Sequence, residues 1–114
     1  MLKMMNINFW IKRGFSLDES KIKIKSQRKM NKEYWDERYA RSEYAYGEAP
    51  NVFIENTLPN YPVGKILFPA DGEGRNSVYA AKLGWTVLSF DLSDTGKQKA
   101  MDLATANDVD LDYQ

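Results

Sequence analysis

The chain has 114 residues, of which 43% are hydrophobic and 28% are charged, and its 16 basic and 16 acidic side chains cancel to a net charge of zero. A chain of this length forms at most one domain. Cysteine and histidine are both absent, which excludes disulfides, thiolate nucleophiles, imidazole bases and the common zinc sites. Any chemistry must therefore use carboxylates, hydroxyls, lysine or arginine, or a cofactor that brings its own reactivity.

The charge is unevenly distributed along the chain. Residues 1–30 carry eight basic side chains against two acidic ones, a net charge of +6 that the remaining residues balance with −6. We interpret this segment as a basic, poorly ordered leader, or as residues upstream of a true start at Met30, because it holds no recognised binding motif. The alternative is an arm that binds nucleic acid in a salt-sensitive way.

The opening residues do not form the apolar core of a signal peptide, and no stretch is long enough to span a membrane. We therefore expect a cytoplasmic protein that has neither a membrane nor a nucleic-acid partner. The sequence does not indicate an oligomeric state.

Residues 31–63 are expected to form a helical segment. Asn31 is the expected N-cap of a helix over 32–44, on which Trp35 and Tyr39 share a face. Pro50 opens a second, short helix. Two prolines prevent this second helix from running on, Pro59 and Pro62.

Residues 64–114 show a regular alternation of strands and helices. The expected elements are a strand over 65–68, a glycine-rich turn over 71–74, a helix over 76–83 that stops at Gly84, a strand over 85–90, a helix from Ser93 or Asp94 to about Asn107, and a strand that begins over 109–113. These are two consecutive crossover units, which predict an α/β fold: a Rossmann-like parallel sheet with helices on both faces, truncated after the third strand.

The candidate site lies at the carboxyl ends of the first two strands, where parallel sheets bind ligands. Gly72 and Gly74 lack side chains, so their amides can approach an anionic group beside the positive end of the following helix. Asp91 ends the neighbouring strand, where a carboxylate can accept bonds from both hydroxyls of a ribose. The pattern indicates a site for a nucleoside with an anion. The alternative is a tight turn that uses glycine for steric reasons beside a solvated aspartate.

The stretch ILFPADGEGRNSVYAAKLGWTVLSFDLSDTGKQKA resembles the first two motifs of class I S-adenosylmethionine-dependent methyltransferases. It is most similar to small bacterial members of the tellurite-resistance and thiopurine methyltransferase type. YWDERYA and YGEAPN resemble the helix and loop that precede that core. The resemblance covers roughly residues 33–114. It implies S-adenosyl-L-methionine as the cofactor, with residues 64–114 as the first half of its binding core and residues 31–63 as a cover over the site.

The resemblance also implies roles for particular residues. Asp91 would hold the ribose hydroxyls, Leu92 would pack on the adenine, and the glycine turn would line the methionine end. Trp35 and Arg38 would help to close the pocket, or would simply pack their helix against the sheet. The implied cofactor-binding residues are Tyr46, Asp71, Gly72, Glu73, Gly74, Arg75, Asn76, Asp91, Leu92 and Ser93.

Two positions depart from the family pattern. Phe68 stands where an acidic residue is common, and Ala70 stands where glycine is common. Phe68 cannot bind the ammonium group of the methionine moiety, and Asp71 is the carboxylate that can supply this charge instead.

Methyl transfer from a sulfonium mainly requires proximity and alignment, so an enzyme of this kind needs neither histidine nor cysteine. We expect a fragment that binds the cofactor weakly at best and transfers no methyl group, because the substrate side of the family's site follows later strands. The sequence does not identify the methyl acceptor. One alternative function is an NAD(P)-binding oxidoreductase fragment, although Ser77 stands where its fingerprint has a third glycine or alanine. The other is a non-enzymatic remnant that pairs its sheet edge with a partner chain.

Overall fold

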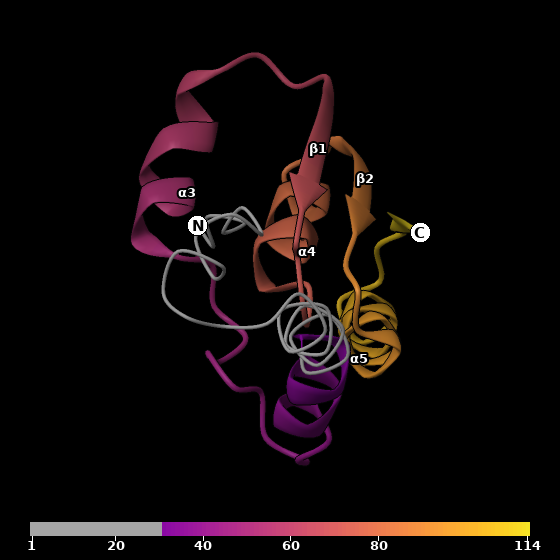
Figure 1. The fold of residues 1–114 in the computed structure, drawn as a ribbon. Coiled ribbons are helices and arrows are strands. Elements are labelled where there is room, and N and C mark those ends of the chain that lie inside the picture. The colour runs from indigo at the N-terminus through magenta and orange to yellow at the C-terminus, as the bar shows by residue number, and fades with distance from the viewer. Residues whose placement is uncertain (1–30) are drawn as a thin grey trace, which may run out of the picture. The chain divides into compact units, whose positions relative to one another are not determined.

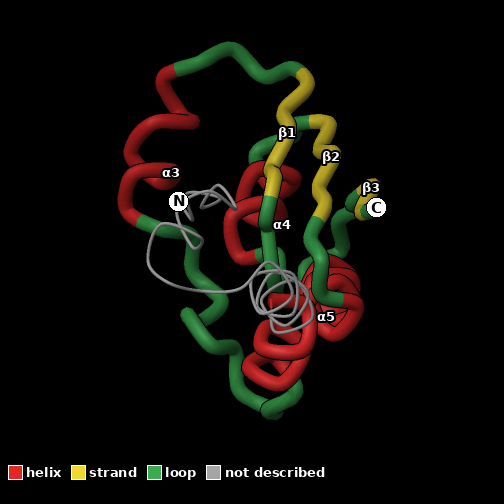
Figure 2. Tube along the Cα trace, in the orientation of Figure 1, coloured by secondary structure: helices red, strands yellow, loops and turns green. Residues whose placement is uncertain are grey.

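Three parallel strands form one open sheet at the centre of the computed structural model, which describes residues 31–114 (Figure 1, Figure 2). The strands are β1 (Lys65–Pro69), β2 (Thr86–Phe90) and β3 (Asp112–Tyr113), in the spatial order β1-β2-β3. Both pairs are parallel, and Pro69 lies beside Phe90. The carboxyl ends of β1 and β2 therefore meet at one edge. This arrangement confirms the predicted α/β fold, while the predicted basic leader lies outside the described residues.

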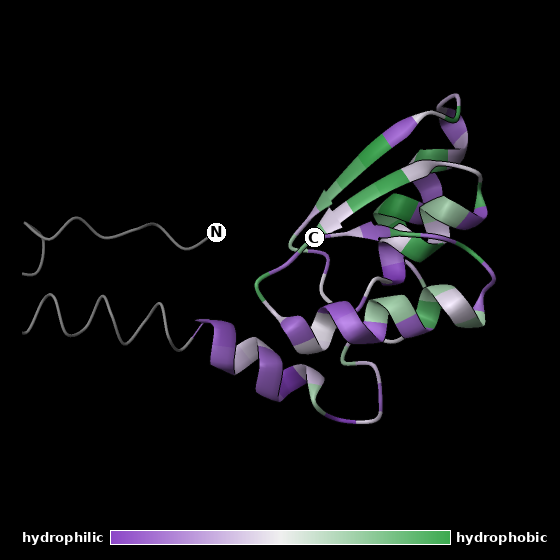
Figure 3. Cartoon of the chain, turned by 90° about the vertical axis from the view of Figure 1, so that its right-hand side faces the viewer, coloured by the Kyte–Doolittle hydropathy of each residue, from purple (hydrophilic) through white to green (hydrophobic). Residues whose placement is uncertain are grey.

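Two helices follow the first two strands and cover one face of the sheet. They are α4 (Arg75–Lys82) and α5 (Asp94–Ala106), and both lie on the same side of the strands in Figure 3. Apolar side chains of the strands and both helices form the core, among them Phe68, Val78, Val87, Ala100 and Leu103. Because side chains alternate along each strand, Phe68 of β1 and Val87 of β2 point towards the helices.

The other face of the sheet is exposed within the described part of the chain. Leu67, Leu88 and Phe90 point to this face and keep 53%, 39% and 44% of their surface accessible. The sequence predicted helices on both faces. Two successive crossovers that advance in the same direction place both of their helices on one face, because such connections share one hand. Covering the second face requires a connection that runs the other way.

The N-terminal segment contains a helix over residues 31–39, then α3 (Val52–Thr57) and the 3₁₀ helix η1 (Leu58–Asn60). The helix is shorter than the expected 32–44, and Asn31, the expected N-cap, is itself a helical residue. After the helix ends, Lys99 Nζ donates to the carbonyl oxygens of Arg41 and Glu43 at 2.9 and 2.6 Å. These backbone groups, which have no helical partner, are thereby satisfied by a distant ammonium group.

Side-chain caps define where α3 and α5 begin. Asn51 Oδ1 accepts a hydrogen bond from the Ile54 amide at 2.8 Å. Ser93, and not Asp94, caps α5: its hydroxyl accepts from the Gly96 amide at 3.0 Å and donates to Asp36 in the first helix. Asp36 thus adds a carboxylate at the positive end of α5, which is electrostatically favourable.

The remaining element boundaries differ from prediction by a few residues. The third strand is shorter than expected, and Asp108 before it has a φ of 55°. Gly84, with a φ of 99°, ends α4 as predicted. No helix among residues 31–114 is long and apolar enough to cross a membrane.

Gly74, which precedes α4, cannot carry a side chain for two separate reasons. Its φ is 82°, and a Cβ there would lie 2.7 Å from the Ala100 Cβ. Gly47 shares the first reason only, since its φ is 79° and nothing lies within 4 Å of an added Cβ. Gly47→Ala should therefore lower the free energy of unfolding by about 1 kcal/mol.

Gly74→Ala should lower the free energy of unfolding by about 1–3 kcal/mol more than Gly47→Ala does, because the added methyl group also overpacks the contact with Ala100 of α5. Urea denaturation of both variants checks this. Equal losses would contradict the account of Gly74.

Candidate functional site

The glycine turn after β1 and the acidic residue after β2 are in direct contact. Asp91 Oδ2 accepts a hydrogen bond from the Gly72 amide at 2.9 Å, and Asp91 Oδ1 accepts from the Ser93 amide at 2.9 Å. The predicted juxtaposition of Gly72 and Asp91 is therefore present. The two oxygens of a carboxylate offer about four acceptor positions. Asp91 is held in place by two amides and retains the capacity to accept hydrogen bonds from a ligand.

The glycines of the turn serve packing more than ligand binding. The Gly72 amide donates to Asp91, and the Gly74 amide donates to the carbonyl oxygen of Asp71 at 3.2 Å. A Cβ on Gly72 would lie 2.6 Å from the Tyr39 hydroxyl, and the Tyr113 hydroxyl donates to the Gly72 carbonyl oxygen at 2.6 Å. The expectation that both glycine amides are free for a ligand is corrected here, because the protein itself uses them.

A cavity of about 320 Å³ opens at these strand ends. Its volume falls at the lower end of the range for small-molecule sites, about 300–1,000 Å³. Of the predicted site residues, Arg38, Gly72, Gly74 and Ser93 do not line it. Those that do are Trp35, Tyr46, Asp71, Glu73, Arg75, Asn76, Asp91 and Leu92, together with Tyr39, Gly47, Phe68, Pro69 and Ala70.

The polar side chains of the GEGRN stretch fasten the loop over residues 40–51, called loop 40–51 from here on. Glu73 Oε1 accepts a hydrogen bond from the Ala45 amide at 2.7 Å. Asn76 Oδ1 accepts from the Asn51 amide at 2.9 Å. Both residues border the cavity, but these oxygens bind the loop that forms its wall. The structure therefore gives Glu73 and Asn76 a supporting role that the sequence did not indicate.

Lys99 of α5 completes this attachment. Its ammonium group forms an ion pair with Glu73 and also binds two carbonyl oxygens of loop 40–51. The same ammonium lies 4.6 Å from the centre of the Tyr44 ring, and the Tyr44 hydroxyl donates to the Lys99 carbonyl oxygen at 3.2 Å. Sequence reasoning missed Lys99, because a helix lysine is ordinarily solvated and its partners are distant in the chain.

Asp71 is a partly buried carboxylate at the cavity wall. It accepts a hydrogen bond from the Ser77 hydroxyl. Burial raises the pKa of Asp71 to about 6, and the nearby Asp91 carboxylate adds to this rise, while the hydrogen bond from Ser77 opposes it. Asp71 therefore changes charge close to neutral pH.

Aromatic side chains of the first helix form another part of the wall. The Trp35 and Tyr39 rings stack with their centres 5.5 Å apart, which agrees with their predicted common face. Burial raises the pKa of the Tyr39 hydroxyl, so it stays protonated against Gly72. Two guanidinium groups lie near the Tyr46 ring, that of Arg38 at 5.2 Å and that of Arg75 at 5.5 Å from its centre.

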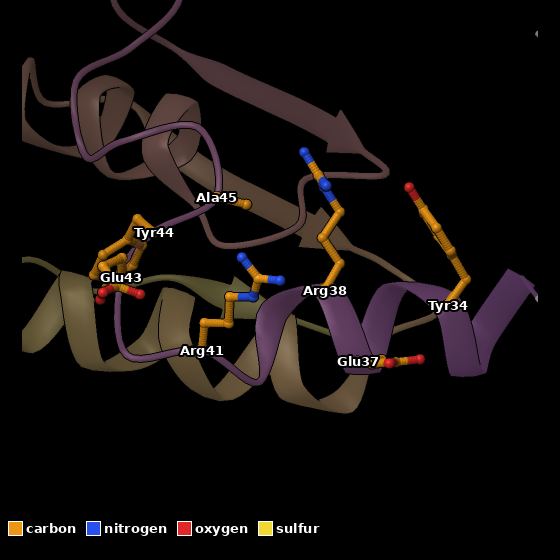
Figure 4. A pocket seen from close by; sticks show the side chains of 7 residues that line it. All are labelled: Tyr34, Glu37, Arg38, Arg41, Glu43, Tyr44 and Ala45. Carbon is orange, nitrogen blue, oxygen red and sulfur yellow. The ribbon is translucent and has the colours of Figure 1, made fainter.

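A second cavity, of about 630 Å³, lies between the first helix and loop 40–51 (Figure 4). It contains Arg38, which the sequence assigned to the cofactor pocket, and Arg41, which the sequence did not single out. Its lining residues are Tyr34, Glu37, Arg38, Arg41, Glu43, Tyr44 and Ala45.

Comparisons with known proteins bear on the fold. No family model and no curated protein matches the chain. The chain is similar to a solved structure from work on the conversion of a disulfide bond into a thioacetal group during echinomycin biosynthesis, with 25% identity and a TM-score of 0.59. The match covers 73% of this chain and 38% of the other, so the chain spans well under half the length of that neighbour. The chain has a methyltransferase-like α/β fold.

Replacing Lys99 by methionine should strongly destabilise the protein. The change leaves the buried Glu73 carboxylate without its counter-charge, which should cost about 3 kcal/mol in the free energy of unfolding. Denaturation with urea measures this loss. The double variant Lys99→Met with Glu73→Gln should recover part of it, and Lys97→Met, at an exposed position of the same helix, serves as control. A loss no larger than that of the control would contradict the role of Lys99.

Replacing Asp71 by asparagine should alter the pH dependence of stability. The folded-state pKa of Asp71, about 6, lies above its ordinary value of 3.8. The protonated form of Asp71 therefore favours the folded state: its contribution to stability is complete below the ordinary pKa of 3.8 and is lost as pH rises through about 6. At about pH 8 Asp71→Asn should be more stable than the wild type, by on the order of 2 kcal/mol, and the difference should shrink towards about pH 4.

Thermal or urea unfolding across this pH range tests the Asp71 prediction. Asp110→Asn, which changes an exposed carboxylate, should leave the profile unchanged. A constant difference between Asp71→Asn and the wild type at all pH values would refute the assignment.

Proposed function

We propose that residues 33–114 form the S-adenosyl-L-methionine-binding part of a methyltransferase. The observation that carries the proposal is the Asp91 carboxylate, which two amides hold at the wall of the cavity. A fixed carboxylate with unused acceptor positions suits the two adjacent hydroxyls of a ribose, because both hydroxyls donate. The methyltransferase-like fold supports this assignment.

The residues around Asp91 suit the adenosyl group. Leu92 follows Asp91, lines the cavity and is 65% exposed, so its side chain offers an apolar surface to a purine ring. Trp35 and Phe68 add further apolar surface to the same cavity. We assign ribose binding to Asp91 and adenine packing to Leu92.

The amino-acid end of the cofactor would rely on side chains. Arg75 and Asp71 both line the cavity, and they can pair with a carboxylate and an ammonium group respectively. The amides of Gly72 and Gly74 are already engaged, so they add little there. When bound, the cofactor supplies the methyl group, and the work of the protein is to bind and align it.

Isothermal titration calorimetry with S-adenosylhomocysteine tests the proposal. The chain should bind this demethylated product of the cofactor, and NAD should give no comparable heat. Asp91→Asn should weaken binding by at least about tenfold, because it removes a charged acceptor for the ribose hydroxyls. Asp110→Asn provides the matched control. Equal affinity of the wild type and Asp91→Asn, or tighter binding of NAD, would contradict the assignment.

A further inference from the structure

Loop 40–51 forms part of the wall of the 320 Å³ cavity, although its residues make turns and bends and no helix or strand. Tyr46 and Gly47 are the two loop residues that line the cavity. Tyr46 is 51% exposed, and an added Cβ at Gly47 would meet no atom within 4 Å. Close packing therefore does not hold this wall, and its position depends on contacts elsewhere in the loop.

Those contacts converge on the ammonium group of Lys99, in helix α5. An ammonium group has three N–H donors. Lys99 Nζ donates to the carbonyl oxygens of Arg41 at 2.9 Å and Glu43 at 2.6 Å, and it forms an ion pair with the Glu73 carboxylate. The side chains of Lys99 and Glu73 are only 14% and 5% exposed. Three oxygens thus match the three donors, and the whole group is committed to fastening the loop.

Glu73 carries the attachment from Lys99 to the cavity. Its Oε1 accepts a hydrogen bond from the Ala45 amide at 2.7 Å, and Ala45 directly precedes Tyr46. Its Oε2 is buried and forms the ion pair with the Lys99 ammonium group. The carboxylate therefore joins α5 to the loop one residue before the wall. Lys99 itself is not among the residues that line the cavity.

We propose that Lys99 is a positioning residue of the cofactor site. Through Glu73 and the loop carbonyls, its ammonium group holds Tyr46 and Gly47 as the wall over the amino-acid end of the ligand, and so sets the affinity for that end without touching the ligand. The inference rests on the proposed function for the identity of the ligand.

The wall is assigned to the amino-acid end because of its neighbours. The Tyr46 ring lies 5.5 Å from the guanidinium group of Arg75, which we assigned to the carboxylate of the cofactor. The ribose and adenine are assigned to Asp91 and Leu92, which follow β2 and belong to the sheet domain. Movement of the loop should therefore affect one end of the ligand more than the other.

A wall that is held in place raises affinity because less of the site must be ordered on binding. Where only a fraction of the molecules is competent to bind, the apparent Kd rises by the inverse of that fraction. Loss of the ammonium group leaves two loop carbonyls and a buried carboxylate without their partner. If the loop then stays in place in about one molecule in ten, affinity falls about tenfold.

Isothermal titration calorimetry with two ligands tests the role of Lys99. 5′-Methylthioadenosine shares the adenosyl group of S-adenosylhomocysteine but lacks its amino-acid end. Lys99→Met should weaken S-adenosylhomocysteine by at least about tenfold and 5′-methylthioadenosine by less than about twofold. Lys97→Met, at an exposed position of the same helix, should leave both affinities unchanged. Equal weakening of the two ligands, or no weakening of S-adenosylhomocysteine, would overturn the proposal.

Amide hydrogen exchange on the wild-type 114-residue chain tests the same coupling without a substitution, and it decides the question if Lys99→Met does not fold. If attachment of the loop favours S-adenosylhomocysteine, then this ligand must favour the attachment by the same factor. The Ala45 amide, which donates to Glu73, should exchange about tenfold more slowly at saturation with S-adenosylhomocysteine. With 5′-methylthioadenosine its rate should change little. Equal protection by both ligands, or none by either, would contradict the coupling.

The proposed function and the role of Lys99 fail in different ways. Absence of S-adenosylhomocysteine binding to the wild type would refute the proposed function, and with it the assignment of this wall to the cofactor. Binding to the wild type without a difference between the two ligands, in Lys99→Met or in Ala45 exchange, would refute only the role of Lys99.

Discussion

The hydrogen bond from the Gly72 amide to the Asp91 carboxylate is the contact on which the rest of the site depends. It joins the turn after β1 to the residue after β2, at the edge where parallel strands end. Tyr39 and Tyr113 enclose the same glycine from two other elements, with the Tyr113 hydroxyl bonded to the Gly72 carbonyl oxygen. Both backbone polar groups of Gly72 are thereby used, which is the usual fate of buried backbone groups. The contact fixes the carboxylate that we assign to ribose binding.

The second feature of the site is how its wall is attached. Loop 40–51 has little regular structure, so its position depends on contacts with the sheet domain. Glu73, Asn76 and Lys99 provide these contacts through buried or half-buried polar groups. At the other end of the segment, Asp36 binds the Ser93 hydroxyl at the start of α5. The glycine turn therefore organises both the carboxylate and the wall beside it.

The two cavities differ in the side chains that line them. The smaller one combines Asp91 and Asp71 with apolar surface from Leu92 and Phe68. The larger one is lined by two arginines and two glutamates, Arg38, Arg41, Glu37 and Glu43. The Tyr46 ring of the smaller cavity has the guanidinium groups of both Arg38 and Arg75 near it, and interactions of this type stabilise a guanidinium against an aromatic face.

Much of this could be predicted from the sequence. The alternation of apolar runs with glycine and acidic turns predicted the strands, helices α4 and α5 and their parallel order, because these depend on local periodicity and on general connection rules. The position of Asp91 beside Gly72 followed from that topology. The end of the first helix at residue 39 was not predicted, and the Lys99 contacts that hold the stretch after it come from a distant part of the chain. The roles of Glu73 and Asn76 were missed for the same reason: both side chains bind backbone amides whose positions depend on tertiary structure.

The central claim is that an adenosyl group binds at the Gly72–Asp91 contact, and backbone amide chemical shifts test it most directly. On titration with S-adenosylhomocysteine, the amide signals of Gly72, Leu92 and Ser93 should move most. The Gly72 and Ser93 amides donate to the Asp91 carboxylate, and Leu92 directly follows Asp91 in the chain. Amides of the exposed sheet face, such as that of Leu67, should stay in place. Shifts confined to that face, or no shifts at a saturating concentration, would contradict the account.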